Sequence, residues 1–520
     1  MQLTQMIKRN AALYPNKTAT LCGSRHHSWS QLTQRVAKAA SLLSGCGAGE
    51  GDRVAVLALN SDRYYEQFFA VPWSGSVLVP LNIRWSVKEN LFALKDSGAK
   101  VLVVDDAFLP AAEAILAGDS MVERVIHIGD AATPHGMVDY AAELEGQTPM
   151  EDVGRGGEAL AGIYYTGGTT GFPKGVMLSH HNLWISSVSA SLGLDLAHPD
   201  VRYLHAAPMF HAADIAMSYA TTICSAAQVF IPAFDCQALV AAIAEHRVTH
   251  TLLVPTMITM LLGSGVIQGA DLSSLQSIVY GASPMPEGTL RQALADLAGV
   301  GFIQAYGQTE LAPLATILPA RYHVLDGPFA GKLRSAGQAV SCVELEVIDP
   351  TGVPVPCGQV GEVRVRGGNA MQGYWNRPEE SAAVMVDGWI HTGDAGYLDN
   401  DGFLFLVDRV KDMIVTGGEN VYSAEVESAL SRHPAVAEVV VIGIPSDRWG
   451  EQVHALVRLK PDQRLQEGEL IRFCQGEIAG YKCPRSVEVR TNPFPVTGAG
   501  KLRKGDLRAP YWEGHQRRVN

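Results

Sequence analysis

Short apolar segments of the β type alternate with helical segments through the first 300 residues of the chain. The β-type segments cover residues 53–59, 101–105, 124–129, 251–255 and 277–281. This alternation predicts an α/β fold whose layers are built on largely parallel sheets. From residue 343 the pattern becomes a polar–apolar alternation broken by turn residues. That second pattern predicts antiparallel hairpins, which can close into a small barrel.

The length of 520 residues allows about three domains or subdomains. A further change near Asp408 marks the start of a compact α+β unit. In this unit we expect a helix over 423–432 with Ser423 as its N-cap, followed by a strand over 438–443. The predicted organisation is a large N-terminal α/β body of residues 1–408, with a small β-rich subdomain at about 335–408, and a small mobile α+β domain of residues 409–520.

Composition and charge exclude several classes of protein. Hydrophobic residues make up 47% and charged residues 18% of the chain, which is ordinary for a globular protein. No apolar run reaches the ~18 residues of a membrane span, and the first ten residues lack the apolar stretch of a secretory signal. The net charge of −12 argues against a nucleic-acid partner. The eight cysteines form no CxxC motif, so we expect reduced thiols in a cytoplasmic protein. We expect the protein to be a monomer or a homodimer.

The strongest local signal is a loop rich in glycine and threonine. Residues 165–175 hold four glycines, three threonines and Lys174. Glycines allow backbone N–H groups to converge on an anion, threonine hydroxyls add donors, and lysine adds positive charge. The order differs from the P-loop of nucleotide hydrolases, because Lys174 is flanked by Pro173 and Gly175. The pattern predicts a phosphate-binding loop; its alternative, a flexible surface loop, is disfavoured by the threonine and lysine content.

Seven further sequence blocks follow in a fixed order. They are Pro-Met-Phe-His at 208–211, Gly-Ala-Ser-Pro-Met-Pro at 281–286, Gln-Ala-Tyr-Gly-Gln-Thr-Glu at 304–310, Trp-Ile-His-Thr-Gly-Asp at 389–394, Asp-Arg-Val-Lys-Asp at 408–412, Gly-Gly-Glu-Asn-Val-Tyr at 417–422 and Pro-Val-Thr-Gly-Ala-Gly-Lys at 495–501. With the phosphate loop, they resemble the adenylate-forming family of acyl-CoA synthetases, carrier-protein adenylation domains and luciferases over nearly the whole chain. One departure is Gly167, where the family usually has serine. We expect that change to alter ATP affinity without abolishing activity.

The resemblance implies a ligase that uses ATP, Mg²⁺ and coenzyme A to convert a carboxylic acid into its thioester through an acyl adenylate. Residues 419–427 are most similar to fatty acyl-CoA synthetases, so a medium- or long-chain fatty acid is the first expectation. An aryl acid is the alternative within the class. A ligase that loads a carrier protein is disfavoured because no long insertion stands between Gly361 and Trp389. A non-catalytic nucleotide or acyl-CoA binding protein is disfavoured by Glu310, Asp394 and Lys501.

The resemblance also implies roles for single residues. Thr309 would donate to the α-phosphate, Glu310 would bind Mg²⁺, and Lys501 would bridge the carboxylate and the α-phosphate. Without the flanking blocks, Glu310 and Lys501 would be read as solvated side chains. The ATP contacts would come from Thr166, Gly167, Gly168, Thr169, Thr170, Gly171 and Lys174 at the phosphates, Gly281, Ala282, Ser283, Tyr306 and Gly307 at adenine, and Asp394 and Arg409 at the ribose.

The remaining implied roles concern the acid, coenzyme A and domain movement. His211, Ala212 and Ala305 would border the acyl pocket, although His211 is equally compatible with a histidine at the edge of the core. Lys411 would be the hinge of the C-terminal domain. The coenzyme A contacts would come from Gly417, Gly418, Glu419 and Lys482.

Overall fold

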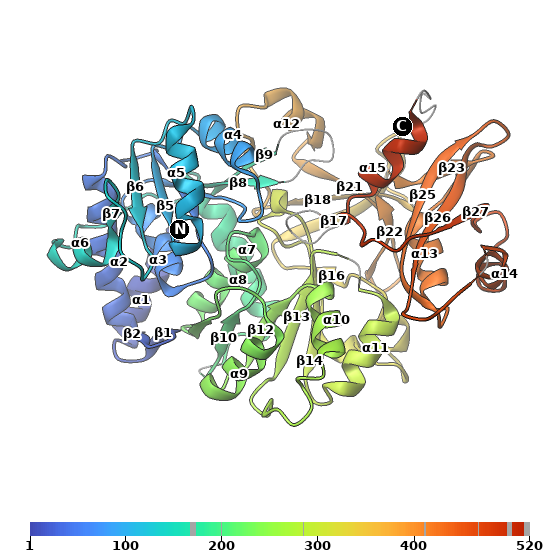
Figure 1. Ribbon diagram of the computed structural model, residues 1–520, viewed down its shortest axis with the longest axis horizontal. Helices are drawn as coiled ribbons and strands as arrows, with labels where there is room; N and C mark the ends of the chain where they lie inside the picture. The colour runs from blue at the N-terminus through green and yellow to red at the C-terminus, as the bar shows by residue number, and fades with distance from the viewer. Residues whose placement is uncertain are drawn as a thin grey trace.

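The computed structural model describes residues 1–166, 173–198, 200–283, 285–409, 412–465, 467–496 and 502–513. Within these residues the strands form four sheets, and helices pack between and around them (Figure 1). No helix of the described ranges is long and apolar enough to cross a lipid bilayer.

Two large sheets form the N-terminal body, and most of their neighbouring strands run parallel, as the alternation of strands and helices predicts. One sheet has the order β19 (Gly373–Tyr374), β9 (Lys174–Ser179), β8 (Leu160–Thr166), β4 (Val77–Pro80), β3 (Arg53–Leu57), β5 (Val101–Val104), β6 (Arg124–His127) and β7 (Val138–Asp139). The other has the order β16 (Gln338–Ala339), β15 (Thr316–Leu318), β14 (Gly301–Tyr306), β13 (Ser277–Gly281), β12 (His250–Leu253), β10 (Arg202–His205), β11 (Ala227–Phe230), β1 (Thr18–Cys22) and β2 (Arg25–Ser28). The apolar segments predicted as strands are β3, β5, β6, β12 and β13.

The helices of the body connect these strands and cover the sheets. They are α1 (Gln5–Leu13), α2 (Trp29–Gly45), α3 (Asp62–Trp73), α4 (Val87–Ser97), α5 (Leu109–Ala117), α6 (Tyr140–Gly146), α7 (His180–Gly193), α8 (Ala212–Ile223), α9 (Cys236–His246), α10 (Pro255–Ser264), α11 (Glu287–Asp296) and α12 (Pro378–Val384). All twelve residues of α3 are buried, including Asp62 and Glu66. Buried carboxylates need partners, and here Asp62 pairs with Arg25 at 2.9 Å while Glu66 pairs with Arg35.

A third sheet contains the hairpins that the sequence predicts after residue 343. Its order is β17 (Val343–Ile348), β18 (Gly361–Gly367), β21 (Trp389–Leu398) and β20 (Met385–Val386), and β22 (Leu404–Arg409) also pairs with β21. All of these pairs are antiparallel. The sheet branches at β21, whose first residues pair with β20 and whose last residues pair with β22, so the hairpins extend along one long strand.

The C-terminal segment has its own sheet, drawn in orange and red in Figure 1. The sheet consists of β24 (Glu419–Val421), β23 (Ile414–Thr416), β26 (Gly450–Leu459), β25 (Val436–Ser446) and β27 (Ser486–Val489), with helices α13 (Ser423–Ser431), α14 (Glu467–Glu477) and α15 (Lys504–Arg508). The strand predicted at 438–443 lies within β25.

The prediction that Ser423 caps α13 is wrong. Tyr422 occupies the N-cap position, and no side-chain hydrogen bond caps the helix there. The backbone N–H and the hydroxyl of Ser423 instead donate to Oδ2 of Asp408, at 2.5 and 2.6 Å. Ser423 therefore connects α13 to the end of the N-terminal body. The Asp408 carboxylate lies at the start of the helix, where negative charge is favoured.

A buried polar cluster lies where β10 meets α8. Both His205 and Asp214 are fully buried, with Nδ1 of the histidine 2.7 Å from Oδ2 of the aspartate. Tyr203 donates to the other carboxylate oxygen at 3.0 Å, and His205 Nε2 lies 3.0 Å from Gln228 Oε1. Each polar group of this cluster has a partner, as a buried network requires.

We expect Asp214→Ala to lower the thermal unfolding midpoint of the protein measurably. Removal of the Asp214 carboxylate leaves His205 and Tyr203 buried without this hydrogen-bond partner, and a buried polar group that loses its partner costs about 1–3 kcal/mol. Differential scanning calorimetry measures the effect. The matched control is Asp119→Ala, which removes the exposed partner of Lys95 and should leave the midpoint unchanged. Equal midpoints for both variants would contradict a structural role for the Asp214 pair.

Candidate active site

One side of the site is built from the ends of β13 and β14. Gly281 and Ala305 lie opposite each other in the parallel register. A Cβ atom on Gly281 would lie 2.1 Å from the carbonyl oxygen of Ala305, and one on Gly307 would lie 1.9 Å from that of Pro313. Only glycine permits so close a backbone approach. The predicted adenine wall thus begins at two places where the backbone packs without side chains, and Ala282 and Ser283 continue it beyond β13.

A carboxylate joins this wall to the third sheet. Asp394, on β21, accepts a hydrogen bond from the Tyr306 hydroxyl at 2.7 Å through Oδ2. Its Oδ1 lies 2.7 Å from Nε of Arg409, which faces it across the β21–β22 pair. Burial, and then the nearby Asp394 charge, raise the pKa of the Tyr306 hydroxyl, so this tyrosine stays a donor at neutral pH. The sequence expectation that Tyr306, Asp394 and Arg409 belong to one site agrees with this geometry.

The segment predicted to be the phosphate loop stands between the antiparallel strands β8 and β9. Thr166 and Lys174 lie opposite each other at its two ends, and the Thr166 hydroxyl donates to the Lys174 carbonyl at 3.4 Å. The Lys174 ammonium pairs with Glu380 of α12 and lies 5.0 Å from the centre of the Tyr374 ring. The other predicted phosphate contacts fall outside the described residues; they are Gly167, Gly168, Thr169, Thr170 and Gly171.

Glu310 lies just beyond β14, in the short 3₁₀ segment Thr309–Leu311. Its Oε1 accepts a hydrogen bond from the Tyr374 hydroxyl at 2.8 Å, and its backbone carbonyl accepts one from Met371 N–H at 2.9 Å. Thr309 is the first residue of the same segment. The carboxylate predicted to bind the metal is therefore held both through its backbone and through one side-chain oxygen.

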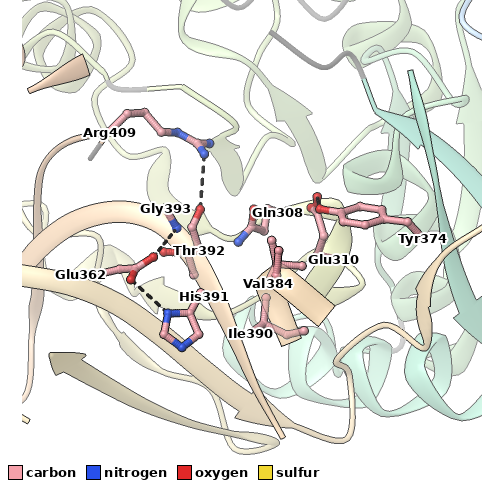
Figure 2. A pocket seen from close by; sticks show the side chains of 11 residues that line it. Gln308, Glu310, Glu362, Tyr374, Val384, Ile390, His391, Thr392, Gly393 and Arg409 are labelled. Atoms are coloured by element: carbon pink, nitrogen blue, oxygen red, sulfur yellow. Dashed lines mark hydrogen bonds and ion pairs between the residues drawn. The ribbon is translucent and has the colours of Figure 1, made fainter. Parts of the chain in front are cut away.

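A pocket of about 340 Å³ connects Glu310 with Arg409 (Figure 2). Between them, His391 Nδ1 lies 3.0 Å from Glu362 Oε2, and Gly393 N–H donates to Glu362 Oε1 at 3.2 Å. Gln308 also lines the pocket, and its buried Nε2 has no hydrogen-bond partner in the described part of the chain. The lining is polar and carries both signs of charge, which suits a ligand with phosphate and hydroxyl groups.

Several lining residues were not singled out from the sequence. Gln308 and His391 stand inside two of the ordered blocks, at 304–310 and 389–394, so the signal for them was present. Glu362 and Tyr374 stand outside every block. They join the site only because β18 and β19 come next to β21 and β9 in the folded chain.

The residues predicted to border the acyl pocket lie on two elements. His211 occupies the N-cap position of α8 without a side-chain cap, and its ring lies 4.2 Å from that of Phe210. Ala212 is the first residue of α8 and is half-buried, as is Ala305 on β14. Helix α8 is fixed near its first turn through the hydrogen bonds of Asp214 to Tyr203 and His205, and none of the three predicted acyl-pocket residues lines the pocket that contains Glu310 and Arg409.

The residues predicted to contact coenzyme A lie away from this pocket. Gly417 and Gly418 form the turn between β23 and β24, with φ angles of +62° and +86°, and both are exposed, as is Glu419. The Lys482 ammonium contacts both oxygens of the Glu425 carboxylate, at 2.7 and 2.9 Å. Lys411 and Lys501 lie outside the described residues. Among the described residues, no pocket-lining side chain follows Arg409.

Comparison with known proteins identifies the class. The family model "AMP-binding enzyme" matches residues 7–375, and "AMP-binding enzyme C-terminal domain" matches residues 425–501. A feruloyl-CoA synthase of Amycolatopsis sp is 40% identical over 96% of this chain and 97% of its own length. The fatty acid–[acyl-carrier-protein] ligase ScoC of Streptomyces coeruleorubidus is 36% identical over 100% of this chain and 98% of its own.

A solved structure supports the same assignment. The o-succinylbenzoate CoA synthetase of Bacillus subtilis, in complex with its acyl-adenylate intermediate, superposes with a TM-score of 0.84 at 30% identity, covering 96% of this chain and 97% of that one. The chain belongs to the AMP-binding enzymes, within the AMP-forming acid–CoA ligases. Ligases of this class use ATP, Mg²⁺ and coenzyme A, as the sequence predicts.

We expect Gly281→Ala to damage the site and lower the stability of the body. The added methyl group would meet the Ala305 carbonyl at 2.1 Å, so the two strands must separate. ATP binding and the thermal midpoint should both fall. The control is Gly288→Ala on α11, where a Cβ meets nothing within 4 Å. That change should stabilise the helix by about 0.5–1 kcal/mol. An active and equally stable Gly281→Ala variant would show that the strands tolerate the methyl group.

Proposed function

We propose that this enzyme activates an aromatic carboxylic acid and transfers it to coenzyme A. The observation that supports an adenylating site most directly is the pocket that joins Glu310 to Arg409 beside the Tyr306–Asp394 contact. The aromatic acid is favoured by the two relatives named for feruloyl and o-succinylbenzoyl substrates. A medium- or long-chain fatty acid, the first expectation from the sequence, is the second candidate, favoured by ScoC. A cytoplasmic location and a monomeric or homodimeric state remain predictions.

ATP would lie with its base between Tyr306 and the wall formed by residues 281–283. The ring of Tyr306 supplies a flat apolar face for stacking. Asp394 and Arg409 would contact the ribose, since a carboxylate can accept hydrogen bonds from both hydroxyls. The ribose hydroxyls would then bind Asp394 beside, or in place of, the Tyr306 hydroxyl and the Arg409 guanidinium.

The metal requirement fits Glu310. In the described chain, no group of three or more His, Cys, Asp or Glu side chains is arranged to hold a metal by itself. Mg²⁺ often binds through one or two carboxylates together with substrate phosphates, and Glu310 lies at the pocket with only its Oε1 hydrogen-bonded to a described side chain. Bound there, the ion would neutralise phosphate charge.

The chemistry has two steps. In the first, a carboxylate oxygen of the acid bonds to the α-phosphorus of ATP, and the bond from that phosphorus to the bridging oxygen of pyrophosphate breaks. In the second, the sulfur of coenzyme A bonds to the acyl carbon and loses its proton, the bond from the acyl carbon to the phosphate-linked oxygen breaks, and AMP departs with that oxygen and the electron pair of the broken bond. The protein has to hold the negative carboxylate of the acid next to the negative phosphates of ATP, in line for attack on the α-phosphorus. Lys501 and Lys174 are the cations that we assign to that task.

We further propose that the segment after Asp408 moves as a unit between the two steps. Both Lys501 and the exposed Gly417–Gly418 turn belong to it, yet they would serve different steps at the two ends of the same acyl–phosphate linkage. A single pose would not bring both to one place, so a hinge at Lys411 resolves the conflict. The hydrogen bonds between Asp408 and Ser423 support a pose in which the unit meets the body close to the hinge.

A panel of acids tests the proposal. The purified protein is mixed with ATP, Mg²⁺, coenzyme A and single acids, including hydroxycinnamates, benzoates, arylacetates and fatty acids of increasing length. AMP release and thioester formation are both measured. We expect the highest kcat/KM with an aromatic acid. A preference for fatty acids would replace the aromatic assignment with the second candidate. AMP release without thioester would indicate a different acceptor.

Ala212 tests the acyl pocket. If the start of α8 borders the acid, Ala212→Trp should shift the preferred acid to a smaller one, because overfilling a packed cavity costs about 1–3 kcal/mol, or roughly 5- to 150-fold in kcat/KM. The matched control is Ala295→Trp, at an exposed position of α11, which should keep the wild-type profile. The same acid profile in all three proteins would place Ala212 outside the pocket.

Lys501 and Gly418 test the division of labour between the steps. Lys501→Ala should lower pyrophosphate release with the preferred acid by a factor of about 100 or more, an effect of the size expected for one charge-stabilising donor. It should still convert a synthetic acyl adenylate and coenzyme A into thioester. Gly418→Leu should show the opposite pattern, because its side chain would obstruct the second pose and its φ of +86° is unfavourable for leucine. Equal loss of both steps in a folded Lys501→Ala protein would refute the two-pose account.

A further inference from the structure

Tyr374 lies between the two charged groups of the phosphate side. It belongs to β19, which pairs antiparallel with β9, so that Tyr374 lies opposite Val176. Its side chain is largely buried, and its hydroxyl donates to Glu310 Oε1 at 2.8 Å (Figure 2). The positively charged Lys174 ammonium lies 5.0 Å from the centre of the same ring, within the range of a cation–π contact. One aromatic side chain thus contacts both Glu310 and Lys174.

The backbone around Tyr374 is fixed on both sides. Its own N–H donates to the Ser381 hydroxyl at 2.8 Å, and the next residue, Trp375, donates to the Gly175 carbonyl at 2.7 Å. On the other side, Met371 N–H donates to the Glu310 carbonyl at 2.9 Å. These bonds tie β19 to the base of the phosphate loop and to the Glu310 segment. The ring is therefore a rigid spacer between these two parts of the site.

The Tyr374–Glu310 hydrogen bond has one direction. The phenolic O–H of Tyr374 donates, and Oε1 of the Glu310 carboxylate accepts at 2.8 Å. A donor on Oε1 restricts rotation of the carboxylate and directs Oε2 elsewhere. This is the arrangement by which neighbouring groups orient a metal-binding carboxylate.

We infer that Tyr374 is a positioning residue that orients Glu310 for Mg²⁺ and seats the Lys174 ammonium beside it. The inference rests on the proposed function insofar as Glu310 is the carboxylate that binds the metal. The hydroxyl of Tyr374 would act on the metal, and its ring would act on the lysine. These two contributions can be separated, because phenylalanine keeps the ring and leucine keeps neither.

The experiment measures ATP binding by isothermal titration calorimetry, first in EDTA and then over a series of Mg²⁺ concentrations. Tyr374→Phe should bind metal-free ATP within twofold of wild type. The Mg²⁺ concentration that gives half of the metal-dependent gain in affinity should rise about 10-fold or more, the usual effect of removing a group that orients a metal ligand. Tyr374→Leu should show the same shift and should also bind metal-free ATP more weakly, because Lys174 loses its aromatic support.

The matched control is Tyr397→Phe. Tyr397 is stacked on Phe405 in another part of the third sheet, so this variant removes a tyrosine hydroxyl elsewhere and should keep the wild-type Mg²⁺ midpoint. Thermal unfolding of all variants shows whether they fold alike, and Tyr374→Phe is the decisive variant because it keeps the volume of the ring.

Three results would overturn the inference. They are a wild-type Mg²⁺ midpoint in Tyr374→Phe, an equal loss of ATP affinity with and without Mg²⁺, and a wild-type protein whose ATP affinity does not respond to Mg²⁺. None of these measurements uses an acid or coenzyme A. A failure of the proposed acid specificity would therefore appear in the acid panel alone, and the two failures are distinguishable.

Discussion

The architecture of the site depends on the two contacts of the Asp394 carboxylate. It accepts the Tyr306 hydroxyl from the end of β14 and pairs with Arg409 at the end of β22. It thereby joins the nine-stranded sheet to the third sheet at the point where the chain leaves the body. A charged acceptor with two strong partners is geometrically specific, so the end of β14 and the end of β22 are held in register. The Glu310–Tyr374 bond makes the corresponding junction with the eight-stranded sheet.

Both junctions place a carboxylate between elements that are far apart in the sequence. The alternative, an apolar contact, would pack the sheets equally well but would leave no group for a ribose hydroxyl or a metal ion. Elsewhere in the body, the two buried carboxylates of α3 are paired with arginines, and Asp214 is hydrogen-bonded to His205 and Tyr203. At the site, by contrast, Glu310 keeps one oxygen and Gln308 keeps one amide nitrogen without a described partner. Other buried polar atoms of the described chain also lack a partner, among them the hydroxyls of Tyr64 and Tyr164, so it is the place of Gln308 and Glu310 at the pocket that makes them candidates for ligand contacts.

The sequence predicted the strands and the ordered blocks because both are local signals. The strands β3, β5 and β13 are short β-branched runs, which local preference and burial both favour. Tyr374 could not be found in this way, since it meets Glu310 from 64 positions away. Glu362 likewise meets His391 from 29 positions away. Ser423 was assigned to a cap for the same reason: the local pattern is that of a helix start, whereas the partner that decides its role, Asp408, lies 15 positions earlier.

The charges at the start of α13 bear on how the C-terminal unit can move. The Lys504 ammonium lies 2.7 Å from Glu427 and 2.6 Å from the Ser423 hydroxyl, and all three residues belong to the unit. Asp408 is the member of this cluster that belongs to the body. A rotation about a hinge after Asp408 would keep the Lys504–Glu427 pair and would exchange the Ser423–Asp408 bonds for water. Each hydrogen bond to the Asp408 carboxylate contributes about 1.5–3 kcal/mol, so new contacts in a second pose would have to offset the loss of these bonds. The same cluster fixes Lys504, and with it the start of α15, to the start of α13, so these two helices of the unit would keep their contact in a second pose.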